Sequence, residues 1–248
     1  MSEGHAFAGS KTDAPGLHDC SAISSLATVS GAQLWLIDLD ASLSDRSASW
    51  VSPAELERSQ RFAFQVDARR HLAAHTALRM LLWRHCDEPA RSDIQRDPFG
   101  RPRLARADAS SFNLSHSGNR ALIGICRQAE VGVDIELLRE VGDVWALAER
   151  VLSPAELDML RRAPESEVSR SFLIAWTRKE ACLKAVGRGL SIAPDSVEVG
   201  LSPTSRPLTL ACADGAWAVD VHSLALDTGA VGAVALASAL PPRFNGAP

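Results

Sequence analysis

Val131-Gly132-Val133-Asp134-Ile135-Glu136 alternates β-branched residues with glycine and acidic residues. Alternation with a period of two, in residues that favour extended backbone, predicts a β-strand. The carboxylates of Asp134 and Glu136 then project from one face of the strand, about 7 Å apart at roughly 3.3 Å of rise per residue. This spacing is also typical of the solvent-facing side of an antiparallel sheet, so it does not by itself indicate a site.

A second informative segment is residues 172–186, whose apolar residues recur at helical spacing and predict a helix. Within it, Glu180 and Lys184 are four residues apart and therefore lie next to each other on one helix face. If this helix met the strand, three carboxylates and one ammonium group would come together. That set suits Mg²⁺ bound to a phosphate, because Mg²⁺ usually binds through one or two carboxylates plus substrate phosphates. The alternative is an exposed helical ion pair worth roughly 0.3–0.5 kcal/mol.

The composition is that of a globular protein. The chain has 248 residues, 46% of them hydrophobic and 23% charged, which is enough for one large domain or two small ones. A formal net charge of −4 does not indicate nucleic-acid binding, although it permits a local basic patch for phosphates. The five cysteines are widely spaced without a C-x-x-C motif, as in reduced cytoplasmic proteins. Without a membrane span of roughly 18 apolar residues or a signal peptide, we expect a cytoplasmic protein with no membrane partner.

Helices and strands are predicted in alternation along the chain. Helices are expected from Ser52, over 67–84, over 144–150, from Ser153 and over 165–186. Strands are expected at 32–39, 112–117, 121–126 and 131–137, and in a terminal sheet near 196–200, 207–211, 216–223 and 230–237. The three strands between residues 112 and 137 follow one another closely, which suggests an antiparallel meander.

The chain also contains a short internal echo. Ser153-Pro154-Ala155-Glu156-Leu157 repeats Ser52-Pro53-Ala54-Glu55-Leu56, and each copy precedes a long helix and then strands. We interpret this as a weak internal repeat that joins near residues 128–131. The alternative is a chance repetition of a common helix start. The resulting division is a flexible N-terminal tail (1–30), an N-terminal half (31–129), a C-terminal half (130–240) and a C-terminal tail (241–248).

Four groups of residues together resemble the 4′-phosphopantetheinyl transferases of the Sfp (surfactin-synthetase-activating) type. The groups are Phe99-Gly100-Arg101-Pro102, Phe112-Asn113-Leu114-Ser115-His116-Ser117, Val131 to Glu136, and Trp176 to Lys184 with Gly187-Arg188-Gly189-Leu190. They occur in the family's order and at family-like separations, and with the helical region 52–84 they span nearly all of residues 32–240. G-V-D-I-E alone is weak, but its combination with W-x-x-K-E-A-x-x-K is specific.

The resemblance implies an α/β (α+β) fold of two similar halves related by a pseudo-twofold axis. It implies transfer of the phosphopantetheine arm of coenzyme A to a serine of an acyl or peptidyl carrier protein, with release of adenosine 3′,5′-bisphosphate. Asp134, Glu136 and Glu180 would hold Mg²⁺ against the pyrophosphate, and Glu180 would also serve as, or position, the base for the carrier serine. Lys184 would contact the pyrophosphate and stabilise the leaving group. These roles suit phosphoryl transfer, which depends on positioning and charge neutralisation.

The resemblance further implies contacts to coenzyme A. Arg70 is the expected ligand of the 3′-phosphate, and Ser115 and His116 resemble a pair that contacts the 3′-phosphate and the ribose region. Arg58 and Arg101 occupy places where the family often has lysine. For these two arginines, solvated surface charge is an equally good interpretation.

The carrier protein is expected to dock near Glu180, on a rim for which Arg178, Arg188 and the pair at 161–162 are candidates. Which carriers are served stays open among fatty-acid, polyketide and peptide-synthetase types. The internal duplication suggests a monomer. A non-catalytic module that binds coenzyme A or another nucleotide remains an alternative, whereas a nucleotide kinase would require a G-x-x-x-x-G-K-[ST] loop that the sequence lacks.

Overall fold

The computed structural model describes residues 21–41, 47–89, 92–106, 110–188, 191–213, 215–226 and 229–241. Of the predicted tails at 1–30 and 241–248, residues 1–20 and 242–248 lie outside the described residues. The described strands form two four-stranded antiparallel sheets and a small pair, β3 (Gln95–Arg96) with β4 (Pro102–Arg103).

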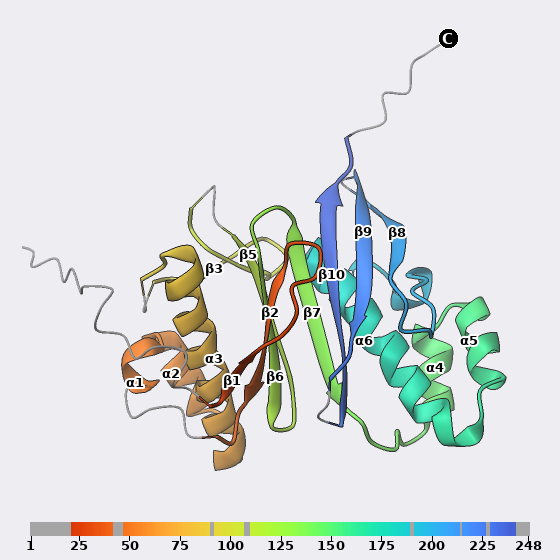
Figure 1. The fold of residues 1–248 in the computed structure, drawn as a ribbon, viewed down its shortest axis with the longest axis horizontal. Helices are drawn as coiled ribbons and strands as arrows, with labels where there is room; N and C mark the ends of the chain where they lie inside the picture. The colour runs from red at the N-terminus through yellow and green to blue at the C-terminus, as the bar shows by residue number, and fades with distance from the viewer. Residues whose placement is uncertain are drawn as a thin grey trace, which may run out of the picture.

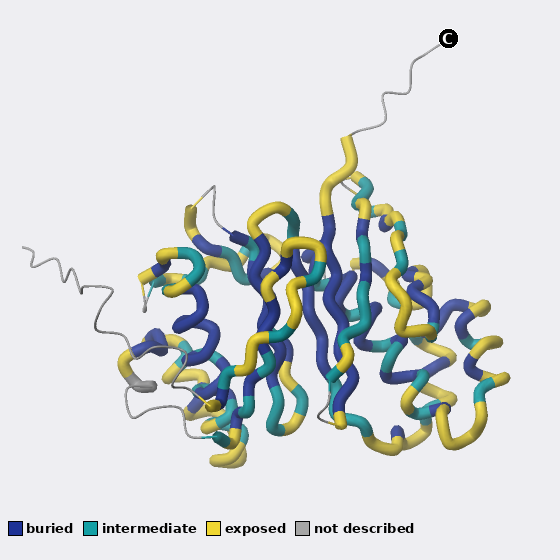
Figure 2. The backbone as a smooth tube through the Cα atoms, viewed as in Figure 1, coloured by how far each residue is buried: buried dark blue, intermediate teal, exposed yellow. Residues whose placement is uncertain are grey.

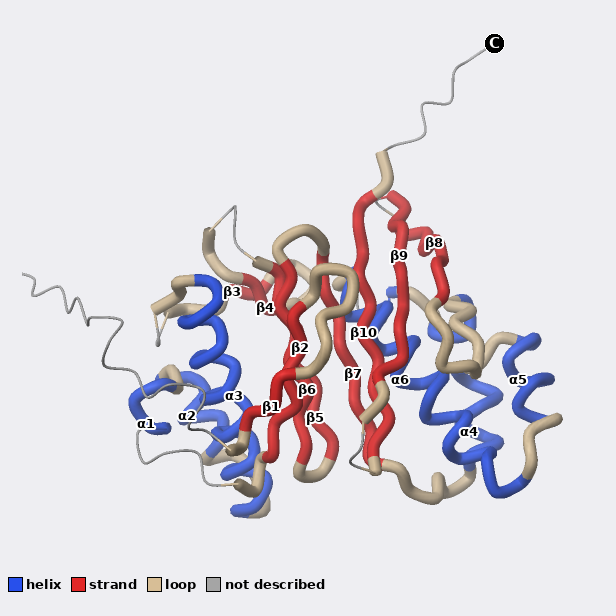
Figure 3. Tube along the Cα trace, viewed as in Figure 1, coloured by secondary structure: helices blue, strands red, loops and turns tan. Residues whose placement is uncertain are grey.

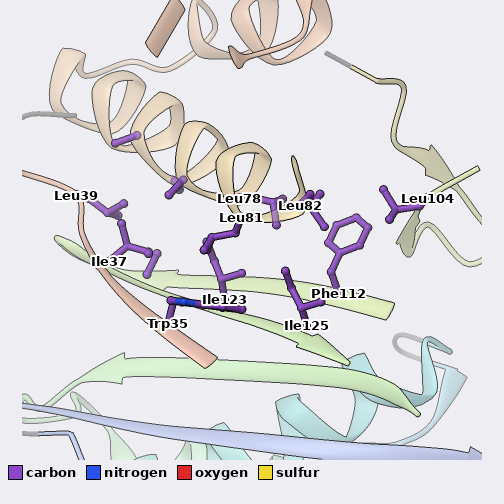
Figure 4. Close-up of a cluster of buried hydrophobic side chains, with 14 residues drawn as sticks. Trp35, Ile37, Leu39, Leu78, Leu81, Leu82, Leu104, Phe112, Ile123 and Ile125 are labelled. Atoms are coloured by element: carbon purple, nitrogen blue, oxygen red, sulfur yellow. The ribbon is translucent and has the colours of Figure 1, made fainter. Parts of the chain in front are cut away.

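The first sheet belongs to the N-terminal part of the chain. Its order is β1 (Ile23–Ser25), β2 (Gln33–Asp38), β6 (Arg120–Cys126), β5 (Ser111–Ser117). The associated helices are α1 (Ser47–Trp50), α2 (Pro53–Ser59) and α3 (Gln65–Cys86). Figure 4 shows α3 lying across the sheet, with Leu78, Leu81 and Leu82 above the sheet residues Ile123 and Ile125.

The second sheet belongs to the C-terminal part. Its order is β7 (Glu130–Leu137), β10 (Ala230–Ala239), β9 (Gly215–Leu224), β8 (Arg206–Cys212). The associated helices are α4 (Val144–Val151), α5 (Pro154–Arg161) and α6 (Val168–Val186), with short 3-10 turns at Glu165–Glu167 and Pro194–Ser196. Helix α6 covers this sheet and packs Ala181, Cys182 and Ala185 against β9 and β10.

The two sheets pack together in the middle of the molecule, with helices on both outer sides (Figures 1 and 3). The central cluster joins Leu34 and Leu122 of the first sheet to Val131, Val133 and Val234 of the second. Figure 2 shows β7 and β10 buried along most of their length. This double burial explains why β10 is apolar almost throughout rather than alternating.

The two halves repeat one arrangement. In the first, β2 is followed by α2, α3, β5 and β6, and the sheet order is β2-β6-β5; in the second, β7 is followed by α5, α6, β9 and β10, and the order is β7-β10-β9. Helices α2 and α5 both begin with a serine N-cap, a proline and a glutamate that completes a capping box. The sequence echo therefore marks equivalent helices.

Three expectations about strands are wrong. Strand β1 lies inside the predicted tail, because Ile23-Ser24-Ser25 is too short to alternate and gains order by pairing with β2. No three-strand meander forms, since β7 pairs with β10 in the other sheet. Residues 197–200 are not a strand, because the carbonyl oxygens of Val197 and Val199 accept hydrogen bonds from α6 side chains.

Candidate active site

Gly132 sets how closely α6 approaches β7. A Cβ atom at this position would lie 2.1 Å from the carbonyl oxygen of Ala181 and 2.3 Å from the amide nitrogen of Ala185. Only glycine therefore lets the helix backbone rest on the strand. Because side chains alternate along a strand, Asp134 and Glu136 share the face of Gly132 and project toward α6, which carries Glu180 and Lys184.

Asp134 and Lys184 meet directly. The Lys184 ammonium lies 2.5 Å from Oδ1 of Asp134, whose residue is 5% exposed. Ser115 of β5 donates its hydroxyl to the same oxygen across 2.7 Å, and Lys184 also donates to Ser115 Oγ across 3.2 Å. The second carboxylate oxygen, Oδ2, is buried and has no hydrogen-bond partner among the residues that the structure describes. The predicted convergence of strand and helix is therefore observed.

Glu136 and Glu180 complete the acidic group. Ser117 donates its hydroxyl to Glu136 across 2.8 Å, and Glu180 is half-buried on α6. Burial raises the pKa of Glu180, with further increases from Asp134 and Glu136 and an opposing decrease from Lys184. Burial also raises the pKa of Asp134, and Glu136 adds to this increase. Lys184 and Ser115 lower the same pKa but do not cancel the effect of burial. Burial therefore raises both pKa values although Lys184 opposes it, and each of the two carboxylates is in electrostatic contact with Glu136.

This arrangement fits a divalent cation by its chemistry. Carboxylate oxygens are the ligands that Mg²⁺ prefers, one of them is buried without a partner, and the mutual repulsion would be relieved by a cation. The described ranges contain no group of three or more His, Cys, Asp or Glu side chains already gathered as a metal site. Lys184 instead provides the positive charge at Asp134.

A cavity of roughly 970 Å³ opens between the two halves, with Glu180 and Lys184 in its wall. Cationic and histidine side chains from the N-terminal half line much of the remaining wall: Arg58, Arg61, His71, His75, Arg79, Arg96 and His116. Glu55 holds two of them, since its carboxylate accepts from Arg79 and contacts His75 at 2.7 and 2.8 Å. The cavity therefore suits an anionic ligand of considerable size.

Of the predicted coenzyme A contacts, Arg58 and His116 lie in this wall. Burial lowers the pKa of His116, and the positive charges of His75 and Lys184 act in the same direction. Ser115 is buried, and its hydroxyl is engaged with Asp134 and Lys184 rather than projecting as an isolated ligand.

Arg101 and Arg70 are placed differently. The side chain of Arg101 lines the cavity but is buried, and its guanidinium donates to the carbonyls of Ala185 and Val131 and to Ser111, and pairs with Glu130. It is thus no solvated surface charge, and it ties the Phe99-to-Pro102 turn to both β7 and α6. Arg70 lies outside the cavity wall and forms two hydrogen bonds with Asp40, at 2.9 and 2.7 Å.

The prediction that Arg178 lies on the surface where the carrier protein docks is wrong. The residue is 1% exposed and donates to the carbonyl of Val199 and the hydroxyl of Ser223. The reasoning from sequence also missed the roles of Gly132 and Ser117. The two-residue period of side chains along a strand could have identified both positions. Gly132 precedes Asp134 by two residues and Ser117 follows Ser115 by two, so each shares a strand face with a predicted site residue.

Comparison with known proteins shows the family of the chain. Residues 130–235 match the family described as the 4′-phosphopantetheinyl transferase superfamily, and residues 42–127 match the family described as 4′-phosphopantetheinyl transferase, N-terminal. The chain is similar to the 4′-phosphopantetheinyl transferase HetI of Nostoc sp. (strain PCC 7120), with 37% identity over 85% of this chain and 90% of that protein. It is also similar to the 4′-phosphopantetheinyl transferase Sfp of Bacillus subtilis (strain 168), with 30% identity over 63% of this chain and 69% of that protein.

A mammalian relative matches at lower identity. The L-aminoadipate-semialdehyde dehydrogenase-phosphopantetheinyl transferase of Mus musculus is 27% identical over 64% of this chain. None of the helices described here is long and apolar enough to cross a membrane. The two matched regions correspond to the two structural halves. The match to HetI extends over most of both proteins. The chain therefore belongs to the 4′-phosphopantetheinyl transferase family.

Proposed function

We propose that this phosphopantetheinyl transferase moves the 4′-phosphopantetheine group of coenzyme A to a serine of an acyl or peptidyl carrier protein in a Mg²⁺-dependent reaction. The observation that supports it best is the Lys184–Asp134 pair beside Glu180, on a large cationic cavity between the two halves. Both halves of one chain line this cavity, which supports a monomeric enzyme. The cysteine pattern supports a cytoplasmic location.

The cavity binds coenzyme A mainly through charge. Its volume of roughly 970 Å³ lies at the upper end of the range for small-molecule and cofactor sites. Arg58, an exposed residue of α2, and His116 of β5 supply donors for the phosphates from the N-terminal side. Lys184 supplies the ammonium group on the C-terminal side, where the pyrophosphate must lie for reaction. Arg70 and Arg101 are less suited to bind phosphate, because their guanidinium groups are already paired.

Asp134, Glu136 and Glu180 would hold the Mg²⁺ ion, which when bound neutralises the pyrophosphate and so favours attack on it. In the chemical step, the hydroxyl oxygen of the carrier serine forms a bond to the phosphorus that carries pantetheine. The bond from this phosphorus to the bridging oxygen breaks, and adenosine 3′,5′-bisphosphate leaves with the electron pair.

Glu180 and Lys184 act on opposite sides of this exchange. The serine proton passes to the carboxylate of Glu180, or to a water that it positions. Glu180 is suited to this role because its carboxylate is half-buried in the cavity wall, where the reacting groups must lie. Lys184 donates a hydrogen bond to the departing phosphate and stabilises its added negative charge.

Intact-mass measurement on a panel of apo-carrier proteins tests the proposal. With coenzyme A and Mg²⁺, a carrier should gain the mass of one phosphopantetheine, and EDTA should prevent the gain. Glu180→Gln and Asp134→Ala should each slow transfer at least 100-fold. Glu167→Gln, which removes an exposed carboxylate at the N-cap position of α6, should transfer at the normal rate.

Two results would contradict it. Folded Glu180→Gln and Asp134→Ala variants that transfer at the wild-type rate would exclude the proposed site. Binding of coenzyme A in calorimetry, with no mass gain on any fatty-acid, polyketide or peptide-synthetase carrier, would indicate a non-catalytic binding module.

A further inference from the structure

Strand β5 faces β7 with an unusual row of polar side chains. Ser111, Asn113, Ser115 and Ser117 alternate along β5, so all four share one strand face. The hydroxyl of Ser111, the amide oxygen of Asn113 and the hydroxyl of Ser117 accept hydrogen bonds from the amides of Val131, Val133 and Leu137. Side chains thus take the place of a backbone ladder between the two sheets.

Two members of this row also contact the acidic side chains of β7. Ser117 donates its hydroxyl to Oε2 of Glu136 across 2.8 Å while it accepts from the Leu137 amide. Ser115 donates to Oδ1 of Asp134 across 2.7 Å and accepts from Lys184. Ser111 instead bonds to the Val131 amide, to Arg101 and to Glu130, which does not belong to the acidic group of Asp134, Glu136 and Glu180.

These two hydrogen bonds hold the carboxylates of Asp134 and Glu136 in fixed orientations. Each serine binds one oxygen, and Oδ2 of Asp134 remains without a partner among the described residues. A hydroxyl fixed in a strand limits rotation of the carboxylate, so less conformational freedom is lost when a cation binds. Hydrogen bonds of this type to metal ligands commonly change metal affinity or activity by 10–100-fold.

We propose that Ser115 and Ser117 are positioning residues, which orient Asp134 and Glu136 for the divalent cation. The proposal rests on the metal site in the function proposed above. It gives Ser115 a role through Asp134 rather than a direct contact with coenzyme A. It also makes the N-terminal half necessary for metal binding, because the carboxylates lie on β7 and both serines lie on β5.

Binding of Mn²⁺, which shares the preference of Mg²⁺ for carboxylate oxygens, tests this directly. Free Mn²⁺ would be followed by electron paramagnetic resonance during titration of the full-length protein with coenzyme A and without carrier. Ser115→Ala and Ser117→Ala should each raise the Kd for Mn²⁺ about 10-fold or more. Ser115→Thr and Ser117→Thr, which keep the hydroxyl, should restore the Kd to within about threefold.

Ser111→Ala is the matched control, because it removes a hydroxyl from the same strand face without touching the acidic group. It should lower stability by about 1 kcal/mol and leave the Kd for Mn²⁺ unchanged. In steady-state transfer, Ser117→Ala should raise the Mg²⁺ concentration for half-maximal rate, with the KM for coenzyme A unchanged.

Unchanged Mn²⁺ affinity in both alanine variants would overturn the proposal. So would an effect of Ser115→Ala confined to the KM for coenzyme A, which would make Ser115 a direct ligand. If Ser115→Ala fails to fold, Ser117→Ala and the threonine variants decide. A wild-type protein without metal-dependent transfer would contradict the proposed function itself, whereas an active wild type with unaffected serine variants contradicts only the positioning role.

Discussion

The ammonium group of Lys179 lies 2.6 Å from the carboxylate of Glu156, and both side chains are buried. The N-terminal half builds the same relationship from Arg79 and Glu55, at 2.7 Å. In each half the glutamate completes the capping box of the shorter helix, and the cation belongs to the longer helix. The internal repeat therefore preserves an ion pair that joins two helices.

The buried pair in the C-terminal half should be costly to break. Glu156 also accepts the amides of Val199 and Gly200, and Lys179 also donates to carbonyls at 194 and 197. Lys179→Met leaves the Glu156 charge buried without its partner and should lower the free energy of unfolding by about 3–5 kcal/mol in urea titrations. Adding Glu156→Gln should recover part of that loss. Losses that simply add would show that the two groups do not depend on each other.

The equivalent change in the N-terminal half should cost less. Arg79→Met should lower the free energy of unfolding by about 2 kcal/mol, because Glu55 is more exposed and keeps its contact with His75. Urea titration beside Lys179→Met compares the two pairs under one condition. A larger loss for Arg79→Met than for Lys179→Met would contradict the reasoning from burial.

Gly132 offers a test of the contact between β7 and α6. Gly132→Ala forces a methyl group into the backbone of Ala181 and Ala185, so it should destabilise the protein by about 3 kcal/mol or more and reduce transfer. Gly142→Ala is the matched control, because nothing lies within 4 Å of a Cβ atom there. It should change stability by less than about 0.5 kcal/mol. Equal thermal unfolding of the two variants would contradict the close approach.

The lowered pKa of His71 should make the protein less stable in mild acid. Burial lowers its pKa from 6.5 to about 4, and its Nε2 is buried without a partner among described residues. Because the folded pKa lies below the unfolded value, the unfolded chain binds more protons, and stability falls as pH drops from 6.5 toward 4. The expected loss between pH 7 and pH 5 is about 2 kcal/mol.

The same urea titrations on His71→Leu provide the comparison. This variant cannot bind the proton, so its stability should change less over the interval from pH 7 to pH 5. A parallel decline in both proteins would assign the pH dependence to other groups.

The chemistry of the site could be predicted from the sequence because it depends on local spacing. Period two places Asp134 and Glu136 on one strand face, and a separation of four places Glu180 beside Lys184. The sequence does not show how distant segments pack. Arg101, Arg70 and Arg178 are charged residues in suggestive motifs, yet each binds a residue far away in the chain. Arg101 binds the Ala185 carbonyl 84 positions away, Arg70 binds Asp40 30 positions away, and Arg178 binds the Val199 carbonyl 21 positions away. For the same reason the predicted three-strand meander is wrong. Strands β6 and β7 belong to different sheets, and no local sequence pattern marks this change.

Lys184 should control how stability depends on pH at the site. It neutralises Asp134, and its removal leaves three neighbouring carboxylates without a counter-charge. The pKa values of Asp134 and Glu180 are already raised, so in Lys184→Met they should rise further. A group whose folded pKa exceeds its unfolded pKa favours folding when protonated, and stability therefore falls as pH rises through the folded value.

Relative to the wild type, Lys184→Met should thus lose more stability at pH 8 than at pH 5. The difference between the two losses should be about 1–3 kcal/mol, less than for a fully buried pair because the lysine is partly exposed. Mg²⁺ should raise the Tm of this variant at pH 8 more than that of the wild type, because the cation takes over the missing positive charge. Lys184→Arg, which keeps the charge, should retain the wild-type pH dependence of Tm. A loss of equal size at both pH values, unaffected by Mg²⁺, would show that Lys184 contributes packing rather than charge.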